Sequence, residues 1–231
     1  MIGIIGALDV ELEFLFSKFR LKKTVKIADK TIYSGKIFNE EAIIAKSGIG
    51  KVNAALTTTL ICSLYKPDYI INIGVAGGLD KTKIGDIILA NGIAYFDVSL
   101  TDIDEIPFGK MGEDPLLLET DRQLFAKAKR IFLKQNIPFH VGNVVSGDRF
   151  VINKSALSDI SGEVDDIQAC EMEGMAVAMV CHKFNIPFLS IRGISDVLDD
   201  SDQGDKFRVS VRDVAKNTIR FVLAFLEDQN E

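Results

Sequence analysis

The sequence predicts an α/β fold in which helices cover both faces of a mixed β-sheet, a three-layer α/β/α sandwich. Short apolar runs rich in β-branched residues alternate with stretches of helical apolar spacing along the whole chain. No linker, repeat or low-complexity segment interrupts this alternation. At 231 residues and 47% hydrophobic content the chain can bury one substantial core. We therefore expect a single domain over residues 1–231.

The first half of the chain is predicted to contain two strand–helix units and a meander of strands. Residues 2–7 form an apolar run, and residues 9–19 then repeat apolar side chains at helical spacing. Residues 51–64 predict a second helix, and residues 69–73 predict the strand that follows it. Between these units, short β-branched segments separated by polar breaks predict strands at 24–27, 31–37 and 42–46.

The second half continues the alternation around one long irregular stretch. Residues 84–96 predict further strands, and residues 121–135 predict a helix capped by Asp121. The stretch 99–118 contains two prolines and two glycines and predicts either a surface excursion or a loop that reaches a neighbouring subunit or closes a pocket. The remaining predicted elements are strands at 139–145 and 188–192 and helices at 174–184 and 210–226.

Composition argues against several partners. The net charge is −6 and the sequence pI is about 5.1, without a basic run, so we expect no nucleic-acid partner. The apolar amino terminus has no basic region before it and is interpreted as a buried strand, not a signal peptide. No segment is long and apolar enough to span a bilayer, so we expect no membrane association.

The cysteine and histidine content predicts a reduced, metal-free protein. Cys62, Cys170 and Cys181 are odd in number and lack paired spacing, which is typical of reduced core thiols in the cytoplasm. His140 and His182 have no second ligand at metal-binding spacing. We therefore expect catalysis without a metal or other cofactor, and a structural or surface role for both histidines.

Two carboxylates, Glu173 and Asp196, lie where apolar segments meet turns, and ligands of α/β sheets bind at the carboxyl ends of strands. Glu171 and Glu173 flank Met172, and they cannot both enter a core unpaired, because a buried unpaired carboxylate is very costly. The glycines of residues 74–78 permit close approach of a ligand or, equally, tight turns. They lack dinucleotide-binding and Walker spacing, which argues against nicotinamide or ATP binding.

Six short motifs occur in order along nearly the whole chain. They are Gly3-Ile4-Ile5-Gly6-Ala7 with Glu11, Ser47-Gly48-Ile49-Gly50-Lys51-Val52, Asn72-Ile73-Gly74-Val75-Ala76-Gly77-Gly78, Val145-Ser146-Gly147-Asp148, Glu171-Met172-Glu173 and Ser195-Asp196. In this order they resemble the purine nucleoside phosphorylase superfamily and, within it, the 5'-methylthioadenosine/S-adenosylhomocysteine nucleosidases. The resemblance implies a nucleoside phosphorylase-like sandwich, a homodimer, and hydrolysis of adenine nucleosides to adenine and a 5'-thio-substituted ribose.

The resemblance also implies a role for each matching residue. Asp196 would be the general acid at the purine, and Glu11 would be the base that deprotonates water. Glu173 would hold the ribose 2'-hydroxyl and balance an oxocarbenium-like transition state, while Arg192 would orient these acids. The chemistry itself requires such groups, because adenine leaves poorly as an anion and general acids typically contribute about 10²–10⁴-fold. A carboxylate near the sugar would stabilise the developing positive charge.

The expected binding residues follow from the same match. Phe150 would stack on adenine, and the main chain of Val151 would bond its edge. Met172 would pack under the sugar. The rest of the substrate-binding set is Ile49 and Phe207, which would line the 5'-alkylthio pocket, together with Ser195 and with Val75, where the family commonly has serine.

Simpler roles remain open for the charged residues. Glu11 lies in the first turn of a predicted helix, where an acid commonly interacts with the helix dipole. Asp196 could form a turn or an N-cap, Glu173 could cap the helix that begins near Gly174, and Arg192 could simply pair with either acid.

The attacking group is predicted to be water. Phosphorylases need two or three arginines around a phosphate dianion, and Asn72 stands where they have arginine. Val75 takes the place of a phosphate-binding serine, and Glu40 and Glu41 fall near another expected arginine. Hydrolysis is therefore favoured over two alternatives, a purine nucleoside phosphorylase and a non-catalytic nucleoside-binding protein. The preferred 5'-substituent stays open.

Overall fold

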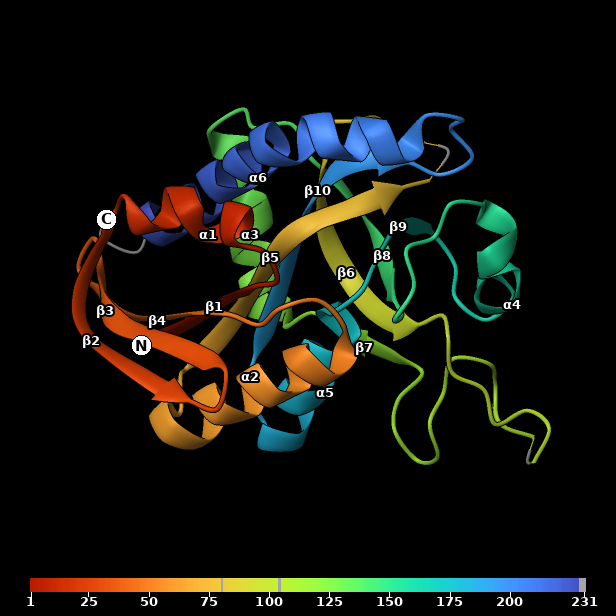
Figure 1. Ribbon diagram of the computed structural model, residues 1–231, viewed down its shortest axis with the longest axis horizontal. Helices are drawn as coiled ribbons and strands as arrows, with labels where there is room; N and C mark the ends of the chain where they lie inside the picture. The colour runs from red at the N-terminus through yellow and green to blue at the C-terminus, as the bar shows by residue number, and fades with distance from the viewer. Residues whose placement is uncertain (80, 104, 229–231) are drawn as a thin grey trace.

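A mixed sheet forms the centre of the protein in a computed structural model that describes residues 1–79, 81–103 and 105–228 (Figure 1). Its strands follow the order β10-β6-β8-β9-β5-β1-β4-β3-β2, and β7 pairs with β6. The bounds of the strands are β1 Ile2–Gly6, β2 Phe19–Ile27, β3 Lys30–Ile37, β4 Glu40–Lys46, β5 Tyr69–Gly78, β6 Ile87–Tyr95, β7 Leu117–Glu119, β8 His140–Ser146, β9 Ile167–Glu171 and β10 Phe188–Val197.

Helices cover both faces of the sheet, which confirms the three-layer α/β/α prediction. One core cluster joins the sheet to α1, α3 and α6 through side chains such as Leu15, Phe132 and Phe225. A second cluster joins the opposite face to α2 and α5 through Ile61 and Met175. Figure 1 shows α1 and α6 above the sheet and α2 and α5 below it. The helices are α1 Asp9–Phe16, α2 Lys51–Tyr65, α3 Arg122–Lys134, α4 Ser158–Ser161, α5 Gly174–Phe184 and α6 Gln203–Glu227, with a 3-10 turn at Lys154–Leu157.

The sheet curls at one end and closes on itself. Strand β5 pairs in parallel with β1 and β10, and its last residues, Gly77 and Gly78, also pair with Cys170 and Ala169 of β9. The strands β5, β10, β6, β8 and β9 thus form a closed ring of pairings. This closure brings the carboxyl ends of β5, β9 and β10 together, which is where ligands of such sheets bind.

Several element boundaries differ from the sequence prediction. Helix α1 ends at Phe16, and Phe19 begins β2 instead of extending the helix. Strands β5 and β10 continue to Gly78 and Val197, and the range 84–96 holds the single strand β6. Helix α6 begins at Gln203, seven residues before the predicted start, and β9 was not predicted. Strand β10 and helix α6 are longer than predicted because the polar residues Ser195, Asp196 and Gln203 are hydrogen-bonded within them.

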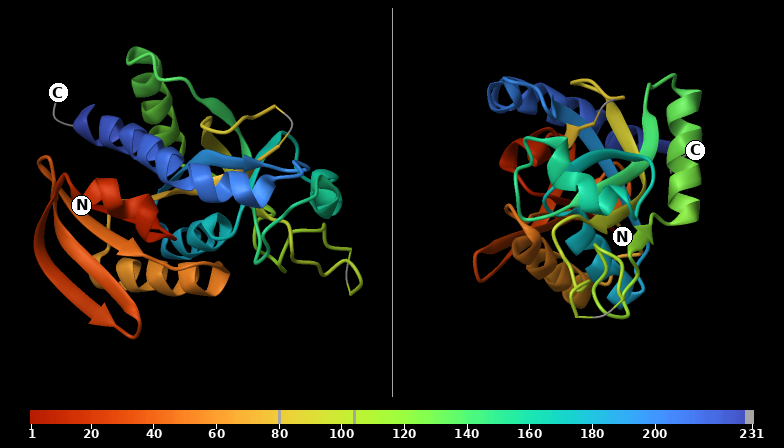
Figure 2. Two further views of the ribbon diagram at one scale, coloured as in Figure 1. Left: turned by 45° about the horizontal axis from the view of Figure 1, so that its top comes forward. Right: turned by 90° about the vertical axis from the view of Figure 1, so that its right-hand side faces the viewer.

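The stretch between β6 and β7 is irregular, as predicted. Its described residues, 99–103 and 105–116, contain turns but no helix or strand. Figure 2 shows this yellow-green segment projecting away from the sheet and helices. Within the described ranges, no helix is long and apolar enough to cross a membrane.

Candidate active site

A cavity of about 360 Å³ opens where the ends of β5, β9 and β10 meet α1, the loop before α2, and the start of α6. This volume is within the range of small-molecule sites. Of the eleven residues expected at the site, ten line the cavity and Arg192 does not. The lining residues are Ala7, Leu8, Glu11, Ile49, Val75, Ala76, Gly77, Arg149, Phe150, Val151, Cys170, Glu171, Met172, Glu173, Ser195, Asp196 and Phe207.

Glu11 is anchored by three backbone N–H groups. Its Oε2 accepts from Ala7 N at 2.7 Å and from Leu8 N at 2.8 Å, and its Oε1 accepts from Val75 N at 3.0 Å. The side chain therefore does more than face a helix dipole, because it joins α1 to the end of β5. Burial raises the pKa of Glu11 above its ordinary value, although these N–H groups and Arg192 favour the ionised form.

Glu173 lies at the start of α5, and its Oε1 accepts a hydrogen bond from Gly50 N at 2.7 Å. Only 7% of the residue is exposed. Burial and the neighbouring Glu171 raise the pKa of Glu173 to about 8, against the opposing effects of Gly50 N–H and Arg192. A carboxyl group with this pKa changes its charge readily near neutral pH, as functional groups often do.

Asp196 is buried and held through both of its oxygens. Ser195 Oγ donates to Oδ1 at 2.6 Å, and Gln203 Nε2 donates to Oδ2 at 2.7 Å. The same Gln203 nitrogen donates to Val151 O at 2.9 Å. Asp196 belongs to β10 and is neither a helix cap nor a turn residue, so its position beside the cavity is fixed by the sheet and by α6.

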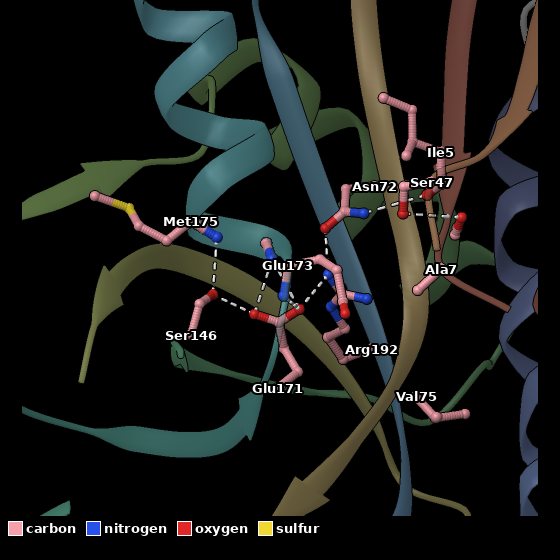
Figure 3. A network of polar contacts seen from close by, with 12 residues as sticks. Ile5, Ala7, Ser47, Asn72, Val75, Ser146, Glu171, Glu173, Met175 and Arg192 are labelled. Carbon is pink, nitrogen blue, oxygen red and sulfur yellow. Dashed lines mark hydrogen bonds and ion pairs between the residues drawn. The ribbon is translucent and has the colours of Figure 1, made fainter. Parts of the chain in front are cut away.

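Arg192, which does not line the cavity, forms a buried ion pair with the lining residue Glu171, with Nη2 2.9 Å from Oε2 (Figure 3). Glu171 also accepts from Ser146 Oγ and from the backbone N–H groups of residues 173 and 174, and Arg192 bonds Asn72. Both Glu171 and Glu173 are buried. This agrees with the expectation that the two acids cannot both be buried without partners, because Glu171 is paired with Arg192. Arg192 is 1% exposed and contacts Glu171 and Asn72 without lining the cavity.

Apolar and aromatic side chains form the rest of the cavity. The rings of Phe150 and Phe207 meet edge to face with centroids 5.7 Å apart. Phe150 and Ile49 are about half exposed at the mouth, at 45% and 55%, whereas Val151 is buried. An aromatic pair over an apolar chamber suits a flat heterocycle with an apolar substituent.

Gln203 is the clearest site residue that sequence reasoning missed. It lies in an acidic segment and resembles a surface residue, but it is 2% exposed and touches both Asp196 and Val151. Ser146 was quoted only as part of a motif, and Asn72 was otherwise used only to argue against a phosphorylase, although both bond the Glu171–Arg192 pair. These side chains could not be recognised as buried from the sequence, because partners such as Val151 for Gln203 and Arg192 for Asn72 lie far away along the chain.

Comparison with known proteins places the chain in a family. The model of the phosphorylase superfamily matches residues 1–227. A 5'-methylthioadenosine/S-adenosylhomocysteine nucleosidase of Maridesulfovibrio salexigens is 36% identical over 229 residues, which cover 98% of this chain and 99% of that protein. A nucleosidase of the same description from Staphylococcus haemolyticus is 36% identical over 85% of this chain and 86% of its own length.

Solved structures with a similar fold indicate the same family. The Neisseria meningitidis nucleosidase of that description, in complex with methylthio-immucillin-A, matches with a TM-score of 0.92 and 32% identity over 98% of both chains. The futalosine hydrolase of Helicobacter pylori matches with a TM-score of 0.91 and 31% identity over 98% of this chain and 97% of its own. The chain thus belongs to the phosphorylase superfamily and, within it, to the family of 5'-methylthioadenosine/S-adenosylhomocysteine nucleosidases. These are N-glycosyl hydrolases, so the protein is an enzyme of that class.

Proposed function

We propose that the protein hydrolyses the N-glycosidic bond of 5'-methylthioadenosine and S-adenosylhomocysteine, releasing adenine and the 5'-thio-substituted ribose. The observation that carries the proposal is the convergence of Glu11, Glu173 and Asp196 on one largely apolar cavity. Three separate elements supply these carboxyl groups, which cleavage of a nucleoside needs on opposite sides of the scissile bond. The activities for which the relatives are named support the same substrates for this chain.

In this proposal Asp196 protonates the purine, so that adenine leaves as a neutral molecule. Its fixed orientation, with both oxygens hydrogen-bonded, supports a directional proton transfer. Glu11 orients and deprotonates the attacking water, and Glu173 binds the ribose 2'-hydroxyl and stabilises the developing oxocarbenium charge. Arg192 acts indirectly, by holding Glu171 beneath the residues that begin α5.

The binding residues divide between the two ends of the nucleoside. Phe150 stacks on adenine, and the main chain of Val151 bonds its edge. Met172 packs under the sugar, and Ile49 and Phe207 surround the 5'-thioether. Ser195 supports Asp196 through its hydroxyl. Val75 offers the cavity a methyl group where a serine hydroxyl is common in the family.

The charge of the cavity favours water over phosphate as the attacking group. The lining includes Glu11, Glu171, Glu173 and Asp196, against the single cation Arg149. A phosphate dianion needs several cationic donors to offset its desolvation, and the carboxylates would repel it. Hydrolysis is therefore the proposed reaction, without a metal or other cofactor.

We further propose a cytoplasmic homodimer. All three cysteines are buried and free, which suits a reducing compartment. Apolar side chains that follow cavity-lining residues in the sequence are exposed in the single chain, including Val52 at 79% and Ile152 at 55%. Burial of such side chains against a second copy of the chain would stabilise a dimer.

The test is to incubate the purified protein with 5'-methylthioadenosine in phosphate-free buffer, with and without added phosphate, and to follow adenine and the sugar product. Phosphate-independent release with free methylthioribose supports the proposal. Release only with phosphate, as a sugar 1-phosphate, identifies a phosphorylase instead. A parallel incubation with futalosine tests the activity named for the Helicobacter pylori relative. Binding without turnover of either nucleoside would indicate a nucleoside-binding protein.

A further inference from the structure

A buried lysine outside the cavity is connected to the active site through an unbroken series of hydrogen bonds. Lys30 begins β3 and is only 4% exposed, which is rare for lysine. Its Nζ donates to Asp29 Oδ2 at 2.9 Å, Ser47 O at 2.8 Å and Asn53 Oδ1 at 2.7 Å. These three bonds use all three donors of the ammonium group.

The lysine fixes which way the amide of Asn53 faces. An ammonium group can only donate, so the carbonyl oxygen of the amide must face Lys30 and the NH₂ group must face away. The Nδ2 of Asn53 then donates to Ile49 O at 2.8 Å. Lys30 and Asn53 together hold two carbonyls, those of residues 47 and 49, in the loop 47–50 that precedes α2.

That loop makes direct contacts with the site. Ile49 lines the cavity, and the next backbone N–H, of Gly50, donates to Glu173 Oε1 at 2.7 Å. Gly50 has a φ of +94° and a Cβ there would lie 3.0 Å from Asp148 Oδ1, so the direction of this N–H depends on an unusual backbone conformation. A peptide unit of this kind keeps its orientation only while its neighbours hold it.

We propose that Lys30 and Asn53 are positioning residues of the enzyme, which hold the loop 47–50 so that Gly50 N–H stays directed at the Glu173 carboxylate. The inference rests on the proposed function of Glu173. It assigns a role to a buried charged side chain that does not line the cavity. Lys36, farther along the same strand, makes a surface pair with Glu41 and serves as a matched control.

The effect is expected in the pH dependence. Four groups face Glu173: Glu171 from β9, Glu11 from α1, Arg192 from β10 and Gly50 N–H from the loop. The N–H and Arg192 favour the carboxylate, whereas the two acids oppose it. Loss of the Gly50 bond raises the pKa of Glu173 further, so a reaction that needs the carboxylate begins at higher pH.

The experiment measures kcat/KM for 5'-methylthioadenosine against pH in wild type, Lys30→Met, Asn53→Asp and Lys36→Met. Asn53→Asp keeps an acceptor for Lys30 but turns an oxygen toward Ile49 O. In both test variants we expect the acid limb to move up by about one pH unit. At pH values on the acid side of this limb, kcat/KM should be about tenfold lower than in the wild type, and at high pH it should return to the wild-type value. Lys36→Met should match the wild type.

A uniform loss at every pH in a folded Asn53→Asp protein would overturn the inference, since it would indicate a purely structural role. An unchanged profile would do the same. NMR titration of the Glu173 carboxyl carbon measures the pKa of Glu173 in the wild type and in the variants without the need for turnover. The Glu173 signal is assigned as the one that is lost in Glu173→Gln. This titration separates the outcomes, because absence of hydrolysis by the wild type contradicts the proposed function, whereas an unshifted titration in the variants contradicts only the positioning role.

Discussion

Arg192 and Glu171 form an ion pair with both side chains almost entirely buried, 1% and 3% exposed, between two strands that are separated in the sequence by residues 172–187. Glu171 lines the cavity and Arg192 does not, and the hydrogen bonds of the pair reach Asn72 in β5 and the N–H groups at the start of α5. Burial of two charges brings little net stability, but removal of one leaves the other unpaired. The pair is therefore expected to fix the geometry of the site.

Replacement of Arg192 by methionine should lower the free energy of unfolding by about 3–5 kcal/mol, because Glu171 would remain buried without its cation. Urea unfolding at neutral pH measures the change. The double variant Arg192→Met/Glu171→Gln removes both charges and should regain part of the loss. If the double variant were no more stable than the single one, the unpaired carboxylate would not be the cause.

Gly74 is predicted to tolerate no side chain. A Cβ at this position would lie 2.3 Å from Arg192 Nη1 and 2.8 Å from Glu11 Oε1, and both groups are buried and bonded elsewhere. Gly74→Ala should therefore displace Glu11 and reduce kcat by about tenfold or more, as misplacement of a catalytic group does. Gly204→Ala in α6, where a Cβ meets open space, is the control and should leave kcat unchanged. Equal rates for the two variants would contradict the proposed position of Glu11.

Asp196→Asn should reduce kcat by about 10²-fold or more and change substrate affinity little, because only the transferable proton is removed. The amide oxygen can still accept from Gln203 Nε2, and the amide NH₂ can donate to the Ser195 hydroxyl, so the fold should be preserved. Steady-state kinetics and isothermal calorimetry with 5'-methylthioadenosine separate the two effects. Near-normal turnover would show that another group protonates the purine. Asp205→Asn, at an exposed position of α6, is the comparison.

Glu11→Gln should abolish hydrolysis while adenine nucleosides still bind, as measured by calorimetry. The structure adds a cost to this substitution. Glu11 accepts three backbone N–H groups, and glutamine must turn its NH₂ toward at least one of them. We expect a loss of about 1–3 kcal/mol in stability. A variant that loses nucleoside affinity together with its fold would support a structural role for Glu11 instead.

The sequence was sufficient for the architecture because apolar periodicity reports burial directly. The cavity residues were predicted from the resemblance of six motifs to a known family, and the closed sheet brings these motifs together at one cavity. Strand β10 was predicted to stop at Arg192, because a charged residue normally marks a surface. In the fold its polar residues remain buried, since Glu171, Gln203 and Ser195 pair with them.

Lys30 is a second buried polar residue whose environment was not predicted from the sequence. Together with Asp29 it was interpreted as a polar break between strands, but only Asp29 lies in the β2–β3 turn, and Lys30 is the first residue of β3. Its ammonium group nevertheless points inward, to partners seventeen and twenty-three residues away. Pairings of this separation leave no periodic signal in a single sequence. They are fixed only when the register of β3 with β4, Ile32 opposite Ala45, carries Lys30 to the level of Ser47.

Glu173 should make the stability of the enzyme fall as pH rises. Burial and Glu171 raise the pKa of Glu173 from its ordinary 4.5 to about 8, so the native state holds a proton that the unfolded state releases. The resulting stabilisation is fully present below about pH 4.5 and is lost as pH rises through about 8. Glu173→Gln removes this dependence and should therefore gain stability relative to the wild type between these values, on the order of a few kcal/mol by pH 9. Thermal unfolding of both proteins across this range measures the difference, and Glu119→Gln, at an exposed site, should follow the wild type. A constant difference between Glu173→Gln and wild type at every pH would mean that Glu173 is already ionised in the empty cavity.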